Sequence, residues 1–346
     1  MTRNSELQDF LKSLPKAEHH IHIEGSCPWD IMARTDPQQF DTPPPSWAGD
    51  YRFETFDDFE QLIFKYVVPW MISPERYAQT VETLFKVRRE ENLRYIEFSF
   101  AGIALEFTGL APREIAQAIR AAVPQDMEAR LYIGLHHSGF SKDQDRYLSE
   151  ILDTPEIDGI DLHGPEEFPL RDWSKEFWKA AKSAGKALKA HAGELSGPSS
   201  VREVIEDLGV TKVQHGIRAI EDPSVMDLAV QAGASFDVCP ISNVKLRNVS
   251  DISEHPLMKL EAAGIPCTLN TDDPFIFGNT LTDDYLAVAE GLNASPKQLA
   301  QFARNGFTTA DLPQSSKLET IAKIDSLLDG YLAATSQASP NSPRVI

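Results

Sequence analysis

The sequence predicts an α/β protein, a single (β/α)8 TIM barrel with a helical insertion after its first strand. Three observations support this fold. Short apolar runs alternate with helix-like segments along the 346-residue chain, and eight β-then-α units are typical of a parallel barrel. Motifs rich in histidine and aspartate end four of the runs, where the strands of a barrel converge. A barrel of this length often forms one domain.

The residue patterns predict where each strand and helix of the barrel lies. The strand candidates are residues 17–24, 93–100, 130–136, 157–162, 187–191, 212–215, 234–239 and 266–270. The clearest helical segments between them are 112–122, 175–184, 200–208, 224–232 and 255–263. Three glycines stand between a helix and the next strand, where a helix stop requires a positive φ angle: Gly185, Gly233 and Gly264.

The first unit carries an insertion at about residues 35–75, with three consecutive prolines at 43–45 and an aromatic, acidic stretch after them. We expect this insertion to form a lid over the barrel mouth. The alternative is a helical excursion packed on the side of the barrel. Residues 336–346 are rich in serine and proline and are expected to be disordered. The predicted domain is therefore one barrel, residues 1–335.

Composition excludes several classes of partner. The formal net charge of −19 argues against nucleic acid, because binding to phosphates requires clustered Lys and Arg. The three cysteines, Cys27, Cys239 and Cys267, have neither the number nor the spacing of a disulfide framework or a thiolate zinc site. The N-terminus lacks a signal-peptide core, and no apolar run reaches the roughly 18 residues of a membrane span. We expect a cytoplasmic enzyme without a membrane partner; the oligomeric state stays open, a homo-oligomer included.

The polar motifs predict one metal site. His20 and His22 alternate along the first strand, so both imidazoles can enter the barrel. His191 ends the fifth strand, and Asp272 follows the eighth. Three imidazole nitrogens and a carboxylate suit one divalent transition ion per chain, and we expect Zn²⁺, which lowers the pKa of a bound water toward neutrality.

Three further residues then have catalytic roles. Glu194, three residues past His191, is placed to carry a proton to the substrate. His215 ends the sixth strand and is expected to hold the attacking hydroxide or to help remove its proton. Asp273 is expected to accept a hydrogen bond from the hydroxide or from a substrate nitrogen. Each motif alone is a weak signal, but all of them fall at strand ends in barrel order.

Six stretches carry a resemblance to a known family: residues 14–26, 159–166, 191–194, 213–216, 238–243 and 269–274. In this order, over residues 14 to about 310, the chain resembles the adenosine deaminase family of metal-dependent barrel hydrolases. The cytidine-type zinc deaminases use a different pattern, which this chain lacks.

The resemblance implies a role for each motif. Zinc would be held by His20, His22, His191 and Asp272. Glu194 would protonate the ring nitrogen beside C6 of a 6-aminopurine, hydroxide oriented by His215 and Asp273 would attack C6, and ammonia would leave a 6-oxopurine. The backbone of Gly164 would contact N3. Glu24 stands where nucleoside deaminases of the family meet the ribose hydroxyls.

Departures from the family pattern lie at the mouth and leave the substrate open. The adenosine deaminases usually carry Asp where Glu24 stands, and Ser99 stands where Arg is common. His136 and His137 replace an Arg-His pair, and His163 replaces a small residue before Gly164. His136 and His163 are therefore candidate substrate contacts.

We expect a purine nucleoside or nucleoside-like substrate, with free adenine as the alternative. A further alternative is another metal-dependent amidohydrolase acting on an aminated heterocycle. Two-metal amidases or phosphoesterases on this barrel commonly use a modified lysine near the end of strand four, which this chain lacks. A non-catalytic binding protein would not require Glu194. His19, where the family has an apolar residue, is expected to point away from the metal.

Overall fold

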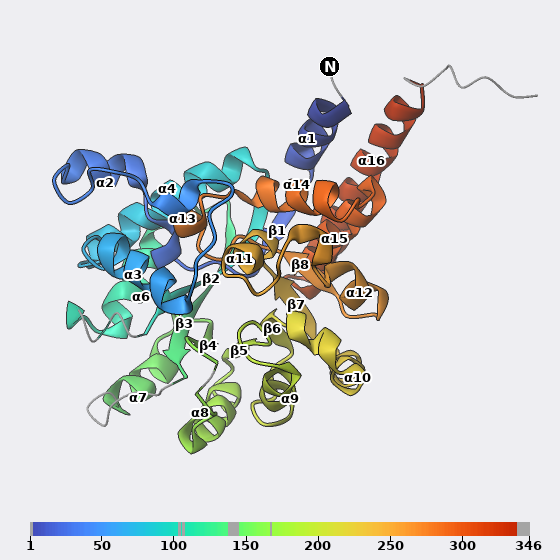
Figure 1. The fold of residues 1–346 in the computed structure, drawn as a ribbon. Helices are drawn as coiled ribbons and strands as arrows, with labels where there is room; N and C mark the ends of the chain where they lie inside the picture. Colours follow the sequence, from blue (N-terminus) through green and yellow to red (C-terminus); the bar gives the residue numbers. More distant parts are fainter. Residues whose placement is uncertain (1–2, 103–104, 106–107, 138–144, 167, 338–346) are drawn as a thin grey trace, which may run out of the picture.

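The computed structural model describes residues 3–102, 105, 108–137, 145–166 and 168–337, and it confirms the predicted barrel (Figure 1). Eight parallel strands follow one another in sequence order around the sheet. They are β1 (Lys16–Glu18), β2 (Leu93–Ala101), β3 (Glu128–His136), β4 (Gly159–His163), β5 (Ala187–Ala192), β6 (Lys212–His215), β7 (Ser235–Val238) and β8 (Cys267–Leu269). Each one overlaps a predicted strand.

Strand β1 is shorter than predicted, because regular pairing ends at Glu18. Beyond it the chain pairs through single residues: the Asp272 amide donates to the His20 carbonyl at 3.1 Å, and the His22 amide donates to the Asp272 carbonyl at 2.9 Å. Glu24 begins a 3-10 turn, η1 (Glu24–Ser26), rather than ending a strand. The isolated bridge between Ile21 and Asp272 joins the first and last strands, and a second bridge, between His22 and Ser99, joins this segment to β2. Together they keep residues 20–22 at the mouth.

Helices surround the sheet (Figure 1). Between successive strands lie α4 (Pro74–Glu90), α6 (Pro112–Ala122), α7 (Asp145–Asp153), α8 (Asp172–Ser183), α9 (Pro198–Glu206), α10 (Pro223–Ala232) and α12 (Leu257–Ala262). Two short 3-10 turns, η5 (Ile217–Glu221) and η6 (Ile252–Glu254), and the helix α11 (Pro240–Lys245) lie in the loops. The predicted positive φ angles are confirmed at Gly185, Gly233 and Gly264. Among the described residues, no helix combines the length and apolar character that a membrane span requires.

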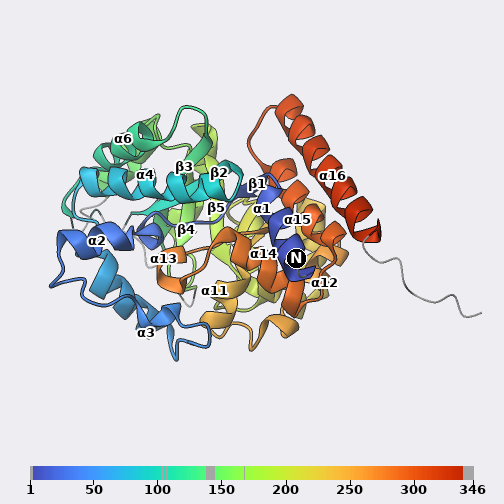
Figure 2. The same ribbon diagram turned by 90° about the horizontal axis from the view of Figure 1, so that it is seen from above.

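Further helices follow β8: α13 (Pro274–Phe277), α14 (Leu281–Gly291), α15 (Pro296–Thr309) and α16 (Gln314–Gln337). The N-terminal α1 (Arg3–Ser13) packs beside α16, where the rings of Phe10 and Tyr331 stack at 4.5 Å, on the side away from α2 (Trp29–Thr35) (Figure 2). Residues 336 and 337 belong to α16 and are helical, because the helix runs on past the predicted boundary. The rest of the predicted disordered stretch, 338–346, lies outside the described residues.

The insertion after β1 forms α2, the 3-10 turn η2 (Pro45–Trp47), α3 (Phe56–Leu62) and a π-helical turn, η3 (Ile63–Val67). Thr55 caps α3 in a capping box with Asp58, which satisfies two amides at the helix start. Phe59 stacks on Phe277 of α13 at 5.7 Å, so this end of α3 is anchored to the loop after β8.

A buried ion network holds the strand ends in place. The Arg88 guanidinium on α4 donates to Glu18 of β1 at 2.7 Å, to Glu91 at 2.7 Å and to the Thr271 hydroxyl at 2.7 Å. Thr271 also donates to Glu18 at 2.5 Å. Because Thr271 directly precedes Asp272, this network fixes the backbone on which Asp272 stands.

Replacing Arg88 by alanine should destabilise the fold strongly, because Glu18 and Glu91 would stay buried without a cation. Loss of one partner of such a buried network costs about 3–5 kcal/mol. The control is Arg89→Ala: Arg89 is half exposed and pairs with the exposed Asp126, a type of pair that contributes about 0–1 kcal/mol. The free energy of unfolding, measured in urea, checks both variants. Equal losses would contradict the assigned role of the network.

Candidate active site

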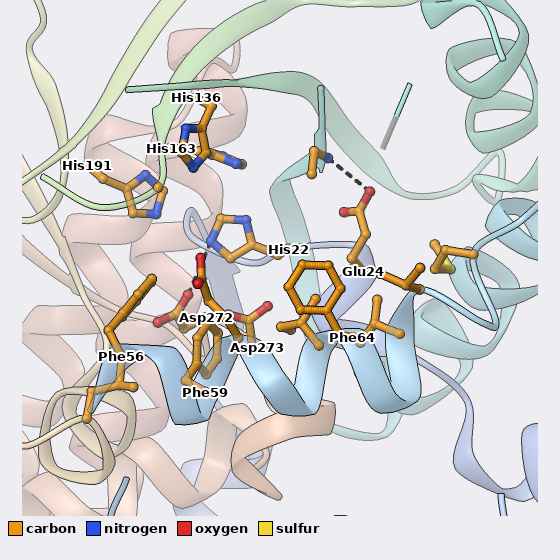
Figure 3. Close-up of a pocket in the computed structure, with 18 of the residues that line it drawn as sticks. His22, Glu24, Phe56, Phe59, Phe64, His136, His163, His191, Asp272 and Asp273 are labelled. Atoms are coloured by element: carbon orange, nitrogen blue, oxygen red, sulfur yellow. Dashed lines mark hydrogen bonds and ion pairs between the residues drawn. The ribbon is translucent and has the colours of Figure 1, made fainter. Parts of the chain in front are cut away.

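The carboxyl ends of the strands surround a cavity of about 400 Å³ (Figure 3). The candidate site residues line it, with the exception of His20, which lies beneath: His22, Glu24, His136, His163, Gly164, His191, Glu194, His215, Asp272 and Asp273. Residues as far apart in the chain as His22 and Asp273 are thus brought to one place, as strand-end positions in a barrel require.

Three imidazoles and one carboxylate converge at the base of this cavity. The Nε2 atoms of His20 and His191 lie 3.1 Å apart. The Asp272 Oδ1 atom lies 3.3 Å from His20 Nε2 and 3.2 Å from His22 Nε2. The four predicted ligand residues therefore come together from the segment after β1, from β5 and from the segment after β8; Figure 3 labels His22, His191 and Asp272.

The hydrogen bonds of these imidazoles fit a bound cation. His20 Nδ1 lies 3.1 Å from the Asp237 carbonyl, and His191 Nδ1 lies 2.9 Å from the Leu162 carbonyl. A carbonyl only accepts, so both Nδ1 atoms carry the proton and both Nε2 atoms present a lone pair. Two lone pairs at 3.1 Å repel one another unless a cation lies between them. Imidazole nitrogen with carboxylate oxygen is a donor set that suits a divalent transition metal.

The electrostatics of the cluster agree with this fit. Burial alone would lower the pKa of His22, but the carboxylates of Asp273, Asp272 and Asp161 outweigh burial and raise that pKa to about 10. Burial would raise the pKa of the Asp272 carboxyl, yet His20 and its neighbours hold it well below the ordinary value. The cluster therefore has an excess of negative potential, which favours a cation.

Two residues of the cluster have unusual backbone conformations. His215 has a φ angle of 63° and Asp272 of 65°, in the left-handed region that non-glycine residues seldom adopt. Such strain costs about 1–3 kcal/mol per residue and persists only where surrounding contacts impose it. One such contact is the Ser242 hydroxyl, which donates to Asp272 Oδ2 at 2.6 Å and turns Oδ1 toward the imidazoles.

Glu194 lies beside the cluster, in contact with two side chains. Its Oε2 atom lies 3.4 Å from His215 Nε2, and Asn248 donates to Oε1 at 3.1 Å. Burial raises the pKa of the Glu194 carboxyl well above its ordinary value, and the charge of Asp272 raises it further. A carboxyl with a raised pKa is suited to deliver a proton to a bound molecule.

The loop that carries Glu194 is organised around one buried carboxylate, that of Glu166. This carboxylate accepts hydrogen bonds from four backbone amides and one hydroxyl: Gly193 (2.8 Å), Glu194 (2.8 Å), Leu195 (3.2 Å), Ser196 (3.2 Å) and the Ser200 side chain (2.9 Å). Successive amides around an anion form a rigid turn. The orientation of the Glu194 side chain therefore depends on Glu166.

Asp273 and Glu24 reach the cavity beside His22. Burial raises the pKa of the Asp273 carboxyl to about 8, and the charges of Asp272 and Glu24 add to the shift. Glu24 Oε1 accepts from the Tyr77 hydroxyl at 2.8 Å and from the Ala101 amide at 2.9 Å. Glu24 Oε2 is buried without a partner among the described residues. It can therefore accept a hydrogen bond from a bound molecule.

Two residues that depart from the family pattern, His136 and His163, line the cavity (Figure 3). A third, Ser99, lies behind them: its Oγ atom is 3.0 Å from His22 Nδ1 and 3.3 Å from His163 Nε2. The His136 ring lies over Gly164, whose φ angle is +84°, and a Cβ atom on this glycine would be 2.3 Å from His136 Nε2.

The opposite side of the cavity is apolar and comes from the insertion. In α3 and η3, the residues that line the cavity are Phe56, Phe59, Glu60, Ile63, Phe64 and Val67; Figure 3 labels the three phenylalanines. This part of the insertion therefore borders the cavity, and its role as a lid stays a prediction. The π-helical form of η3 is itself frequent at functional sites.

Sequence patterns missed the supporting residues. Glu166 and Ser242 lie within motifs that were recognised, but nothing in one sequence shows which atoms they contact. Asn248 follows α11, and its sequence context carries no signal that would distinguish it.

The expectation for His19 is confirmed: its ring contacts Glu97 at 3.3 Å and the Gly306 carbonyl at 2.7 Å, inside the barrel and away from the cluster.

Replacing Glu166 by glutamine should loosen the Glu194 loop, because an amide NH2 would face amide N–H groups that need an acceptor. A buried donor left unpaired costs about 1–3 kcal/mol. Hydrogen exchange at residues 193–196 should become faster, and the midpoint of thermal unfolding should fall. Glu176→Gln, at an exposed position on α8, is the control. Unchanged exchange at residues 193–196 would contradict the organising role of Glu166.

Comparisons with known proteins agree with this geometry. The sequence pattern of the family described as adenosine deaminase matches residues 15–327. The adenine deaminase of Aspergillus oryzae is 30% identical over 95% of this chain and 99% of its own. The aminodeoxyfutalosine deaminase of Streptomyces avermitilis is 28% identical over 95% of each chain. A zinc-bound amidohydrolase from Burkholderia ambifaria has the same fold, with a TM-score of 0.82, 20% identity and 96% coverage of both chains. The chain belongs to the adenosine deaminase family and is a hydrolytic deaminase that acts on a C–N bond.

Proposed function

We propose that this protein is a zinc-dependent hydrolase that deaminates a 6-aminopurine to a 6-oxopurine and ammonia. One observation carries the proposal: two buried carboxyls, Glu194 and Asp273, line the cavity on either side of the His/Asp cluster, and burial raises the pKa of each. A purine has ring nitrogens on both sides of C6, so N1 and N7 can each receive a hydrogen bond from one of these acids while C6 lies over the cluster.

His20, His22, His191 and Asp272 would hold the metal. A divalent metal in such a donor set supplies Lewis acidity and makes water nucleophilic at neutral pH. Glu194 gives its proton to N1, which makes C6 electrophilic. His215 and Asp273 orient the attacking water. The C–O bond forms at C6 and the C–N bond breaks; of the two water protons, one leaves with the amino group as ammonia and the other restores Glu194.

Free adenine is the substrate that the cavity and the relatives support first. The unpartnered Glu24 Oε2 suits the N–H of a free base. The wall of α3 and η3 is mostly apolar, with Glu60 as its one polar side chain among the described residues, so it offers little to the hydroxyls of a ribose. Curated relatives of the chain include adenine deaminases.

A nucleoside-like 6-aminopurine with an apolar substituent is the second candidate. The cavity of about 400 Å³ lies within the usual range for drug-sized ligands, so it holds more than a bicyclic base. Phe56, Phe59 and Phe64 extend along it and suit an aromatic or alkyl group. A relative named aminodeoxyfutalosine deaminase shows that family members also act on a larger compound.

The segment α3–η3 is proposed to act as a lid over this cavity. Its apolar side chains would exclude water from the reaction once substrate is bound. Phe64 and Ile72 remain largely exposed, at 55% and 60% of their surface, and closure over an apolar substituent would bury them.

Ammonia release tests the function and the role of Glu194. The zinc-loaded protein should deaminate a member of a panel of adenine, adenosine, 2′-deoxyadenosine, aminodeoxyfutalosine and other 5′-modified adenosines. Glu194→Gln keeps the shape but carries no transferable acid proton, and kcat should fall by about 10²-fold or more. The exposed Glu203→Gln on α9 is the matched control. Turnover retained in Glu194→Gln, or absence of turnover across the panel, would contradict the proposal.

Metal binding is tested without substrate. After chelation, added Zn²⁺ should raise the midpoint of thermal unfolding, because a ligand at 100 times its Kd stabilises the fold by about 2.7 kcal/mol. Asp272→Ala should abolish this rise, whereas the exposed Asp227→Asn should keep it. Calorimetry should give one Zn²⁺ per chain. An equal rise in Asp272→Ala would place the metal elsewhere.

A further inference from the structure

Behind the cluster, three buried side chains form a continuous hydrogen-bonded chain that ends at His215. Asn243 Nδ2 lies 3.1 Å from His215 Nδ1, and His255 Nε2 lies 3.1 Å from Asn243 Oδ1. The backbone amide of Leu257 donates to His255 Nδ1 at 3.1 Å. All three residues are buried: the exposed fraction is 1% for His215, 0% for Asn243 and 4% for His255.

The direction of these bonds follows from their first member. An amide N–H only donates, so His255 Nδ1 must accept and carries no proton. Burial lowers the pKa of His255 to about 4, so the ring is neutral at pH 7 and its single proton sits on Nε2. That N–H donates to an oxygen, which orients the Asn243 amide with Oδ1 toward His255 and Nδ2 toward His215.

The position of the proton on His215 follows from the same reasoning. Asn243 Nδ2 donates, so His215 Nδ1 accepts and is unprotonated. Neutral His215 then carries its proton on Nε2, the atom that faces Glu194 Oε2 at 3.4 Å and Asp272 Oδ2 at 3.8 Å. His215 thus presents an N–H donor to the cavity, in contrast to His20 and His191, whose Nε2 atoms present lone pairs.

We propose that Asn243 and His255 are positioning residues that lock His215 in the Nε2–H tautomer and thereby keep it out of the metal-ligand set. The need for such a device is visible in the geometry, because one potential ligand atom from each of His20, His191, His215 and Asp272 lies within 4.8 Å of the others. With a lone pair on Nε2, His215 would be a fourth imidazole ligand. With a proton there, it instead donates to the attacking water or to a neighbouring carboxylate.

Asn243→Asp is the sharpest test, because it has the same shape but no donor. Its carboxylate would accept from His255 Nε2–H and also from His215 Nδ1, which would move the His215 proton to Nδ1. In long-range ¹H–¹⁵N spectra of chelated protein, His215 should show the Nε2–H pattern in the wild type and the Nδ1–H pattern in Asn243→Asp. His215→Gln identifies the signal.

His255 supplies the matched pair of variants. His255→Gln keeps a donor for Asn243 Oδ1 and should retain the wild-type His215 pattern. His255→Leu removes that donor, frees the amide to rotate, and should give a mixture of the two patterns. These variants decide the question if Asn243→Asp does not fold.

Kinetics add a second readout, which rests on the proposed function, whereas the spectra do not. In Asn243→Asp, kcat should fall by about 10²-fold with little change in KM, and zinc should bind at least as tightly because a fourth imidazole lone pair becomes available. A wild-type His215 in the Nδ1–H form, or an unchanged pattern in both Asn243→Asp and His255→Leu, would overturn the proposal. If the spectra change as expected but the protein deaminates no compound of the panel, the result would count against the proposed function alone.

Discussion

The arrangement of the whole site depends on one constraint: nitrogen lone pairs and carboxylate oxygens are held close together in a buried place where they repel. His20 and His191 point unprotonated nitrogens at each other across 3.1 Å, and Asp272 adds a negative charge. Strands alone do not impose this. Carbonyls fix the imidazole tautomers, Ser242 turns the carboxylate, and the Arg88 network holds the backbone beneath. The fold therefore holds mutually repulsive donor atoms at the positions that a bound cation requires.

The barrel and the cluster could be predicted from the residue types at the strand ends, because the carboxyl ends of all the parallel strands lie at the same end of the barrel. The predicted first strand was too long, since an apolar alternating run cannot distinguish a ladder from the isolated bridges at residues 20–22. Glu166, Asn243 and His255 were not assigned roles, for a physical reason. They act through directed hydrogen bonds to partners whose positions exist only in the folded chain, and such bonds leave no periodicity.

Two departures from the family pattern prove to be one contact. Ser99 and His163 looked like independent changes on different strands, but their side chains meet at 3.3 Å. A long arginine at position 99 would occupy the space that the His163 ring fills, and a short hydroxyl leaves it free. Gly134 on the neighbouring strand is required as well, because a Cβ there would lie 2.0 Å from the His163 ring. Ser99, His163 and Gly134 therefore form one packed unit beside the cavity.

The left-handed backbone at His215 has a consequence for protein engineering. Glycine adopts a φ angle of 63° at little cost, so replacing this histidine by glycine would relieve the backbone while it removes the imidazole. The histidine is explained by its place beside Glu194 and Asp272, and not by the backbone that carries it. A screen for thermal stability alone would therefore favour variants that lose this imidazole.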